Sequence, residues 1–280
     1  MSQHNTSFSR ALFQALTLSA IAILLLPVWA RAQPQEEPGR PEIYLIPDCR
    51  DCTSPSEMNL AASISSSSKK PFKVASSQLI LMDAHGEILF TVENPYKMDG
   101  TEAVGRSISG VVATDLREKL APLQTDSYKA VLKVNDLYSN VVRFNVRAKP
   151  EDFRYSDGPG CPGSLSIEPL VDIHGKALPK AFLAYFRNMS EDSVSLAGFS
   201  ASSRVLTDGR KFRREVFMWG GIEGLASGES WGTVVRFASF VSEGRKPIPA
   251  GEHDIQYRFG GCLSNVIRIK VEERPSGANN

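Results

Sequence analysis

The chain has 280 residues, of which 42% are hydrophobic and 22% charged, so it can build a packed core and is not a disordered protein. Lys and Arg together number 32, and Asp and Glu number 31. This near-neutral balance excludes a general electrostatic attraction to nucleic acid or to an anionic membrane, and we expect no nucleic-acid partner. The length allows one large domain or two of ordinary size.

Residues 1–32 have the pattern of a signal peptide that directs export to the periplasm or out of the cell. Arg10 precedes an apolar run over 11–29, and Ala30 and Ala32 flank Arg31 where a signal peptidase would cleave. Cleavage would remove two basic residues and leave 30 against 31 acidic ones. The alternative is an uncleaved membrane anchor, for which the run is close to the minimum length. No cysteine directly follows the run to carry a lipid, and we expect no stable membrane span after cleavage.

Residues 33–40 form a polar, Pro-rich linker, and a first β-rich module is predicted over 41–147. Its strands are expected where apolar residues alternate with polar ones or form short runs between turn residues. One helical turn is expected over 115–120, ended by Pro122. The predicted strands cover residues 43–46, 58–64, 77–82, 88–92, 107–113, 128–134 and 139–146.

A second module is predicted because the last strand of the first one repeats. SNVVRFNV at 139–146 returns as SNVIRIKV at 264–271, with five of eight positions identical. Further matches keep their order and place their gaps in loops, where insertions are tolerated, so we infer a duplication. The matches pair Leu60, Ala62 and Ile64 with Phe182, Ala184 and Phe186; Leu81 and Asp83 with Leu206 and Asp208; Ser107 with Ser230; and Tyr128, Ala130, Leu132 and Val134 with His253, Ile255, Tyr257 and Phe259.

Strand alternation in the repeated stretch predicts which side chains face the core. Val142, Phe144 and Val146 should point inward, as should the matching residues of the second copy. Arg143 and its counterpart Arg268 should point away from the core. The predicted boundaries are 1–32 for the signal peptide, 33–40 for a linker, 41–147 for the first module, 148–160 for a second linker, 161–272 for the second module and 273–280 for a tail.

All four cysteines lie in the predicted mature chain, where an even number in an oxidising compartment favours disulfides. A bridge between Cys161 and Cys262 would close a loop of roughly 100 residues and stabilise the fold by about 4.7 kcal/mol in the chain-entropy model. The first module has Leu137 in place of Cys262, so it cannot form this bridge. Cys49 and Cys52 are expected to form a small local disulfide. The alternatives are a redox-active pair, which no convincing helix supports, and a zinc site, which lacks further ligands at suitable spacing.

Each module contains roughly seven short strands with turn signals between them, a pattern typical of an antiparallel β-sandwich. The predicted fold class is therefore all-β, with two tandem sandwiches after the signal peptide. The stretches at 181–196, with a turn at 188–192, at 225–230 and at 248–257 resemble bacterial immunoglobulin-like or fibronectin-type-III-like modules. This resemblance implies a sandwich fold and a role in binding or scaffolding, with no particular ligand. The Cys…Trp…Cys spacing of antibody domains is missing.

Gly228-Glu229-Ser230-Trp231-Gly232 matches the G-x-S-x-G nucleophile elbow of α/β-hydrolases. That chemistry needs a strand before the serine, a helix after it, and an acid and a histidine further along the chain. Residues 233–237 are predicted to form a strand, and His253 is the only histidine downstream. We therefore interpret the motif as a loop that leads into a strand, and no residue is predicted to be catalytic.

Three other patterns have a structural and a functional interpretation. Two Asp-x-His-Gly stretches, at 83–86 and 172–175, are interpreted as ordinary turns, with metal-binding tips as the alternative. The basic run RKFRR at 210–214 is interpreted as a solvated hairpin edge, with an anionic ligand site as the alternative. The triplet at 188–190 is a glycosylation sequon by pattern, which has meaning only in a eukaryotic secretory pathway. We expect no cofactor and no metal.

Phe217, Trp219 and Trp231 lie in a glycine-rich stretch, and the first module has no Trp. In a sandwich most such residues belong to the core, but exposed ones could form a flat surface for a sugar or a peptide. The predicted function is non-enzymatic binding or scaffolding outside the cytoplasm, with a protein or glycan as partner. One alternative is an inhibitor or accessory subunit that docks on a larger exported enzyme or surface assembly. The other is a hydrolase that uses Ser230.

Overall fold

The computed structural model describes residues 41–52, 58–66, 71–100, 102–103, 107–111, 120, 123–124, 126–146, 160–196, 202–214 and 224–272. The predicted signal peptide, the linker at 33–40 and the tail lie outside these ranges, as do nearly all of the second linker and all of the helical turn except Leu120. Within the described ranges, no helix is long and apolar enough to cross a membrane.

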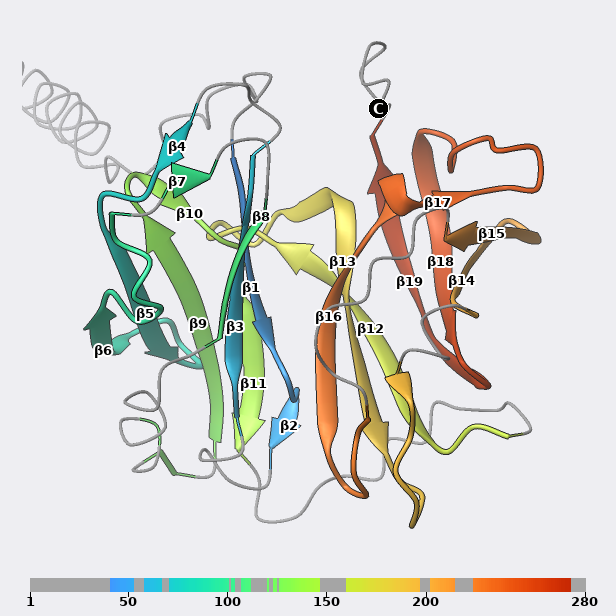
Figure 1. The fold of residues 1–280 in the computed structure, drawn as a ribbon, viewed down its shortest axis with the longest axis horizontal. Helices are drawn as coiled ribbons and strands as arrows, with labels where there is room; N and C mark the ends of the chain where they lie inside the picture. The colour runs from blue at the N-terminus through green and yellow to red at the C-terminus, as the bar shows by residue number, and fades with distance from the viewer. Residues whose placement is uncertain are drawn as a thin grey trace, which may run out of the picture. The chain divides into compact units, whose positions relative to one another are not determined.

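The described part of the chain is an all-β structure (Figure 1). In residues 41–146, one main sheet has the order β1-β3-β8 and the other the order β2-β11-β9-β5-β6, with β10 beside β9, while β4 and β7 form a separate two-stranded sheet. All seven strands predicted here are confirmed with shifted ends, whereas the two-residue strands β2, β4, β7 and β10 escaped prediction. The strands are β1 (Glu42–Pro47), β2 (Asp51–Cys52), β3 (Leu60–Ser65), β4 (Phe72–Lys73), β5 (Ser77–Asp83), β6 (Ile88–Glu93), β7 (Glu102–Ala103), β8 (Ser107–Val111), β9 (Asp126–Val134), β10 (Leu137–Tyr138) and β11 (Val142–Val146).

In residues 160–272, one sheet has the order β12-β13-β16 and the other the order β17-β15-β14-β18-β19. A short 3₁₀ turn at Phe237–Ser239 precedes β17. The strands are β12 (Gly163–Val171), β13 (Ala177–Asn188), β14 (Arg204–Thr207), β15 (Arg210–Arg214), β16 (Ser230–Arg236), β17 (Phe240–Val241), β18 (Gly251–Phe259) and β19 (Cys262–Val271).

The two halves share one strand order, because β1-β3-β8 corresponds to β12-β13-β16 and β11-β9-β5-β6 to β19-β18-β14-β15. The register agrees with most of the sequence matches. Ala62 pairs with Leu45 in the first half, and Ala184 pairs with Ile167 in the second. Leu137 lies opposite Val134 as Cys262 lies opposite Phe259.

One set of matches is wrong by one residue. Leu81 lies opposite Ala130, but the residue opposite Ile255, the match of Ala130, is Thr207 rather than Leu206. The reason is turn length. The β14–β15 hairpin closes in the two residues Asp208 and Gly209, both with positive φ (49° and 71°) as a tight hairpin turn requires, whereas β5 and β6 are joined by a longer turn.

The repeated strand faces the core as predicted. Val142, Phe144 and Val146 are buried and Arg143 is exposed. In β19 the apolar residues at 267, 269 and 271 are buried and Arg268 is exposed. The predicted register of both strands is therefore confirmed.

The Ser-Asn pair that opens the repeat has the same structural role in both halves. The Asn140 amide bonds to both the N–H and the C=O of Leu45 in β1 at 3.0 Å each. Asn265 does the same to Ile167 in β12 at 2.8 and 3.0 Å. The preceding serine hydroxyl accepts the N–H of Leu132 or Tyr257 at 2.9 Å and donates to the next carbonyl at 2.7 Å. Each pair therefore ties the last strand of its half to the strand that begins it.

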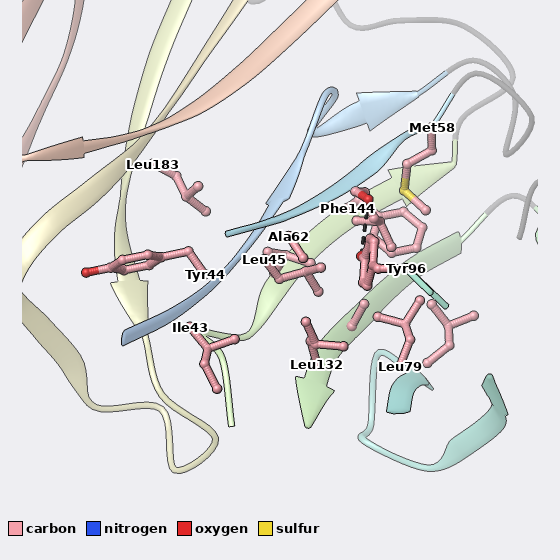
Figure 2. Close-up of a cluster of buried hydrophobic side chains, with 14 of the residues drawn as sticks. Ile43, Tyr44, Leu45, Met58, Ala62, Leu79, Tyr96, Leu132, Phe144 and Leu183 are labelled. Atoms are coloured by element: carbon pink, nitrogen blue, oxygen red, sulfur yellow. Dashed lines mark hydrogen bonds between the residues drawn. The ribbon is translucent and has the colours of Figure 1, made fainter. Parts of the chain in front are cut away.

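The strand β13 contributes to two hydrophobic clusters. Because side chains alternate along a strand, one set of its residues packs with Tyr44, Leu45 and Phe144 of the first half, where Figure 2 shows Leu183 near Tyr44. The other set packs with Tyr257 and other residues of the second half. Residues Gly39–Asn280 accordingly form one compact unit. The first set is Ala181, Leu183 and Tyr185, and the second is Phe182, Ala184 and Phe186.

Two disulfides are present, and both were expected. Cys161 is bonded to Cys262, and Cys49 to Cys52. The two bridges lie at different places in their halves. Cys161–Cys262 joins the start of β12 to the start of β19, and Cys49–Cys52 closes the short loop that leads into β2. Cys49 and Cys52 are 7% and 2% exposed, so their sulfur atoms are shielded from an attacking thiol. This burial favours a structural bridge over a redox pair.

Candidate functional site

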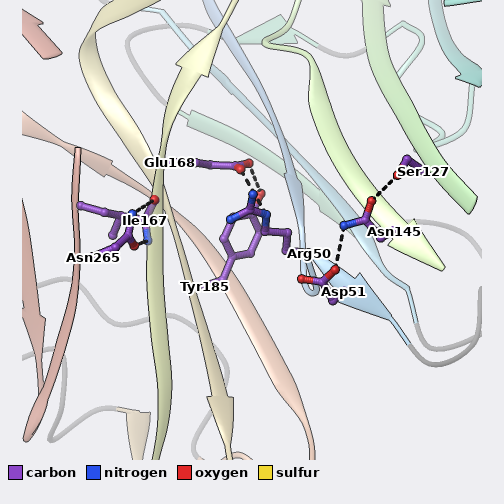
Figure 3. Close-up of polar contacts among 8 residues, drawn as sticks. All are labelled: Arg50, Asp51, Ser127, Asn145, Ile167, Glu168, Tyr185 and Asn265. Atoms are coloured by element: carbon purple, nitrogen blue, oxygen red, sulfur yellow. Dashed lines mark hydrogen bonds and ion pairs between the residues drawn. The ribbon is translucent and has the colours of Figure 1, made fainter. Parts of the chain in front are cut away.

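A polar cluster joins the two halves beside the Cys49–Cys52 loop (Figure 3). Glu168 in β12 accepts a hydrogen bond from the hydroxyl of Tyr185 in β13 at 2.7 Å. Its other carboxylate oxygen lies 3.7 Å from Nε of Arg50 in the first half. Tyr185 is opposite Ser166, two residues from Glu168, so both side chains lie on the same face of the sheet. That face meets the first half.

The disulfide loop itself positions the cation. Asp51 accepts a hydrogen bond from Nδ2 of Asn145 at 2.7 Å, and Oδ1 of Asn145 accepts one from the hydroxyl of Ser127 at 2.6 Å. The N–H of Asn145 donates to the carbonyl oxygen of Arg50 at 2.7 Å. One residue of the loop is thus held against β11 and the other reaches Glu168. The sequence showed the cysteine spacing but not this role for the two residues between them.

The surroundings of Glu168 change its acidity. Burial raises the pKa of its carboxyl above the usual value of 4.5, and the Tyr185 hydrogen bond and the nearby Arg50 charge offset part of that rise. Burial, together with the negative charge of Glu168, raises the pKa of Tyr185 well above its usual value of 10.0. The phenol therefore stays protonated and donates at every physiological pH.

A second group of contacts lies further along the same junction. Glu42 in β1 lies 3.5 Å from Nζ of Lys180 and 3.8 Å from the guanidinium of Arg236 in β16. The Arg236 guanidinium also lies over the Tyr44 ring, 5.0 Å from its centre. In both clusters the charged side chains pair with residues of the same cluster. This arrangement is that of a structural anchor rather than of a reactive centre.

The hydrolase interpretation of Ser230 has no geometric support. Ser230 is the first residue of β16, and the chain continues as a strand to Arg236 rather than as a helix. His253 uses one ring nitrogen on Asp208 at 2.6 Å and the other on the Pro249 carbonyl at 2.9 Å. Both nitrogens are therefore engaged, and neither is available to activate the serine.

Both glycines of that motif have structural explanations. Gly228 has a φ of 77°, a turn conformation that side chains disfavour. A Cβ at Gly232 would collide with the carbonyl oxygen of Pro47, so glycine allows β16 to approach β1 closely. The match to G-x-S-x-G thus reflects a turn and a tight contact between the two halves.

The two Asp-x-His-Gly stretches are turns closed by the aspartate. Oδ1 of Asp83 accepts hydrogen bonds from the N–H groups of residues 85, 86 and 87 at 2.8 to 2.9 Å. These bonds lower the pKa of Asp83, and the bond from Glu87 has the largest effect. Oδ1 of Asp172 accepts those of residues 174 and 176 at 2.9 Å. Across the described ranges, no three His, Cys, Asp or Glu residues are grouped to hold a metal ion.

The proposed aromatic ligand surface is only partly described. Trp231 is half-buried and stacks on Phe259 with ring centres 5.4 Å apart, so it belongs to the edge of the core. Phe217 and Trp219 lie outside the described residues. The Trp231 part of this surface is therefore not available as an open platform.

The sequon asparagine is a buried turn residue. Asn188 is 0% exposed, and its Nδ2 donates to the carbonyl oxygens of Asp192 and Leu225 at 2.8 and 2.9 Å. Its Oδ1 accepts from the N–H and the hydroxyl of Ser190. A glycan on Nδ2 would replace one of the two donated hydrogens and would need space that this fully buried side chain does not have, so the sequence pattern marks a turn.

The basic run at 210–214 was interpreted as a hairpin edge, and this is wrong for its second part. β15 lies between β14 and β17, and Arg213 and Arg214 pair with Val241 and Phe240. The two-residue strand β17 was not recognised because it is too short to show alternation. β15 is therefore an interior strand of its sheet, although Arg210, Lys211 and Arg213 remain exposed on it, so their cross-strand neighbours matter.

Comparisons with known proteins do not assign a family. No family model matches the chain, and no curated protein matches it. Among solved structures, the chain is similar to one described as the BSP domain of a biofilm-associated protein, at a TM-score of 0.28 and 14% sequence identity. That match covers 84% of this chain and 30% of the other. The chain thus spans under a third of that protein's length.

Proposed function

We propose that this protein is an exported, non-enzymatic binding or scaffold protein made of two immunoglobulin-like sandwiches that arose by duplication. The observation that carries the proposal is β13, whose two faces belong to two different cores. A strand buried on both faces, with the Glu168 and Glu42 contacts beside it, favours two modules held in fixed register. Such a body suits presentation of surfaces better than a hinge-driven catalytic cycle.

The two disulfides support a location outside the cytoplasm, since reducing conditions inside cells disfavour such bonds. The signal-peptide pattern of residues 1–32 leads to the same expectation. The test is recovery of the protein from the extracytoplasmic fraction of its source cells, with its N-terminus at Gln33. Immobilised mature protein should retain a protein or glycan from that fraction. The Ser230→Ala variant should retain it equally, and only hydrolysis of the retained molecule that this variant loses would revive the hydrolase alternative.

A second candidate, an accessory or inhibitory subunit that docks on another protein, is favoured by β6. Among the described strands, β6 is an edge strand of its sheet. Its first two residues, Ile88 and Leu89, are 62% and 45% exposed. Exposed apolar residues on an edge strand invite pairing with a strand of a partner. Glu87 and Glu93 flank this stretch. Antiparallel self-pairing would bring these like charges together, so a basic partner segment fits better than a second copy.

The docking candidate is tested with charge placed on the edge. Ile88→Lys and Leu89→Lys change exposed side chains, so the fold should persist while retention of a protein partner falls at least tenfold. Val266→Lys is the matched control, because Val266 is 57% exposed on β19 of the other half. Equal retention by all three variants would contradict docking at β6.

A further inference from the structure

Three arginines lie directly opposite one another on three adjacent strands of the second half. Arg204 of β14 pairs with Arg213 of β15 on one side and with Arg258 of β18 on the other. We call these three residues the arginine row. Of its members, the sequence had singled out only Arg213, as part of the basic run at 210–214, and nothing in the sequence placed the three together.

The arginine row lies on the outer face of the sheet. The next row along the same strands, Phe212, Val205 and Tyr257, is buried in the core, and side chains alternate between faces. Arg213 and Arg258 are exposed and Arg204 is half-buried, with one guanidinium nitrogen donating to the Ser203 carbonyl at 2.7 Å. Lys211, two residues from Arg213, is exposed on the same face.

Like charges directly opposite each other in a sheet are destabilising, and the rest of this face avoids them. On β18 and β19, Glu252 lies opposite Lys270, and Asp254 lies opposite Arg268 with the carboxylate 3.0 Å from the guanidinium. Among the described residues, no ion pair joins an acid to Arg213 or Arg258. The arginine row is therefore an exception within its own sheet.

The first half supplies an internal reference for this exception. The corresponding row of the sheet β6-β5-β9 is Glu93, Gln78 and Lys133. Its charges are of opposite sign, and Nε2 of Gln78 donates to Glu93 at 2.6 Å. The same frame therefore tolerates a neutral row, so the strand arrangement does not require three arginines.

We propose that the arginine row binds an anionic polysaccharide, one that bears carboxylate or sulfate groups. A guanidinium presents paired N–H donors that match the oxygen atoms of such groups. Neighbouring strands are about 4.8 Å apart, so the three guanidinium groups originate across about 10 Å of the outer face. A row of this length suits an extended polymer with recurring charges. A polysaccharide is the polyanion that fits a location outside the cytoplasm, and in this choice alone the inference rests on the proposed function.

The experiment titrates the mature protein with polygalacturonate and with dextran sulfate at low ionic strength, with uncharged dextran and duplex DNA as comparisons. The variants are Arg258→Gln, the double variant Arg213→Gln with Arg258→Gln, and Lys133→Gln, which removes one positive charge at the matched position of the first half. We expect either acidic polymer to bind, with an affinity about tenfold lower in the single variant and about a hundredfold lower in the double variant. Lys133→Gln should change the affinity less than twofold.

Four results would overturn the inference. These are no binding of either acidic polymer, equal binding by the double variant, an equal loss in Lys133→Gln, or row-dependent binding of DNA alone. Circular dichroism and thermal unfolding of each variant separate lost binding from lost fold. Because partner retention at β6 is measured with different variants, failure of the arginine row leaves the proposed binding role standing, and the reverse also holds.

Discussion

The two halves have the same strand order but hold themselves together differently. The second half has the long-range bridge Cys161–Cys262, and the first has only the local Cys49–Cys52 loop. The first half instead obtains part of its core from β13 of the second. The second half also concentrates positive charge in one cross-strand row where the first has a neutral one. The comparison shows that one frame can differ in its covalent bonds and its surface while the Ser-Asn ties of its closing strand stay the same.

The largest expected effect comes from removing the long-range disulfide. Cys161→Ser with Cys262→Ser should lower the free energy of unfolding by about 4 to 5 kcal/mol, because the bridge closes a loop of roughly 100 residues. The same change at Cys49 and Cys52 should cost about 2 kcal/mol, since that loop is short. Urea unfolding of both double variants measures the difference. Equal losses would mean that the bridges do not act through loop closure.

Leu183→Ala is expected to come next, at about 3 to 4 kcal/mol, because Leu183 is 1% exposed and its removal leaves a cavity. By sequence it belongs to the second half, but it packs in the first cluster. Hydrogen exchange measured by mass spectrometry should therefore show lost protection in both halves. Loss confined to one half would show that the two cores unfold independently. Val266→Ala, at an exposed position, is the control and should change little.

Asn140→Ala should cost about 2 to 3 kcal/mol, because it leaves the N–H and C=O of Leu45 without partners in a buried place. Asn265→Ala removes the same two bonds from Ile167, but Asn265 is only half-buried, so water can replace part of them. We expect a loss of about 1 kcal/mol there. Chemical denaturation checks the order, and a larger loss at Asn265 would contradict the burial argument.

Much of this frame could be predicted from local sequence. The alternation and the repeat placed β9, β11, β18 and β19 correctly, together with the core-facing side of β11 and β19. Two kinds of feature were missed. Two-residue strands such as β17 carry no period and form only by pairing with residues far along the chain, and the tight turn at Asp208, although local, shifted one match by a residue.

The candidate sites were predicted less well because opposed residues come from separate stretches. Nothing local to Glu168 indicates that it meets Arg50, which lies more than a hundred residues earlier. Arg258 similarly gains its meaning only from Arg204 across the strand pair. Asn188, in contrast, matched a modification motif by sequence, although its amide is fully used in a turn.

The junction should respond to pH through Glu168. Its pKa is raised in the folded protein, chiefly by burial, so between the unfolded value near 4.5 and the raised value the folded chain binds more protons. Stability from this group should therefore fall as pH rises through that window. Glu168→Gln should remove this dependence while Tyr185 keeps an acceptor. Unfolding curves at several pH values test this, with the exposed Glu243→Gln as control. A pH profile that Glu168→Gln leaves unchanged would contradict it.

The smallest expected effect has the opposite sign. Arg258→Gln relieves repulsion within the arginine row and should raise the free energy of unfolding by about 0.3 to 0.5 kcal/mol at low salt. Added salt should remove the gain, because exposed charges are screened. Lys133→Gln, at the matched position, should give no gain, since Lys133 faces a row that also contains Glu93 and lies near the Tyr138 ring. A residue whose removal stabilises the protein but weakens polyanion binding is retained for its ligand. If Arg258→Gln instead destabilises the fold, the row is structural and its arginines are held by contacts within the protein.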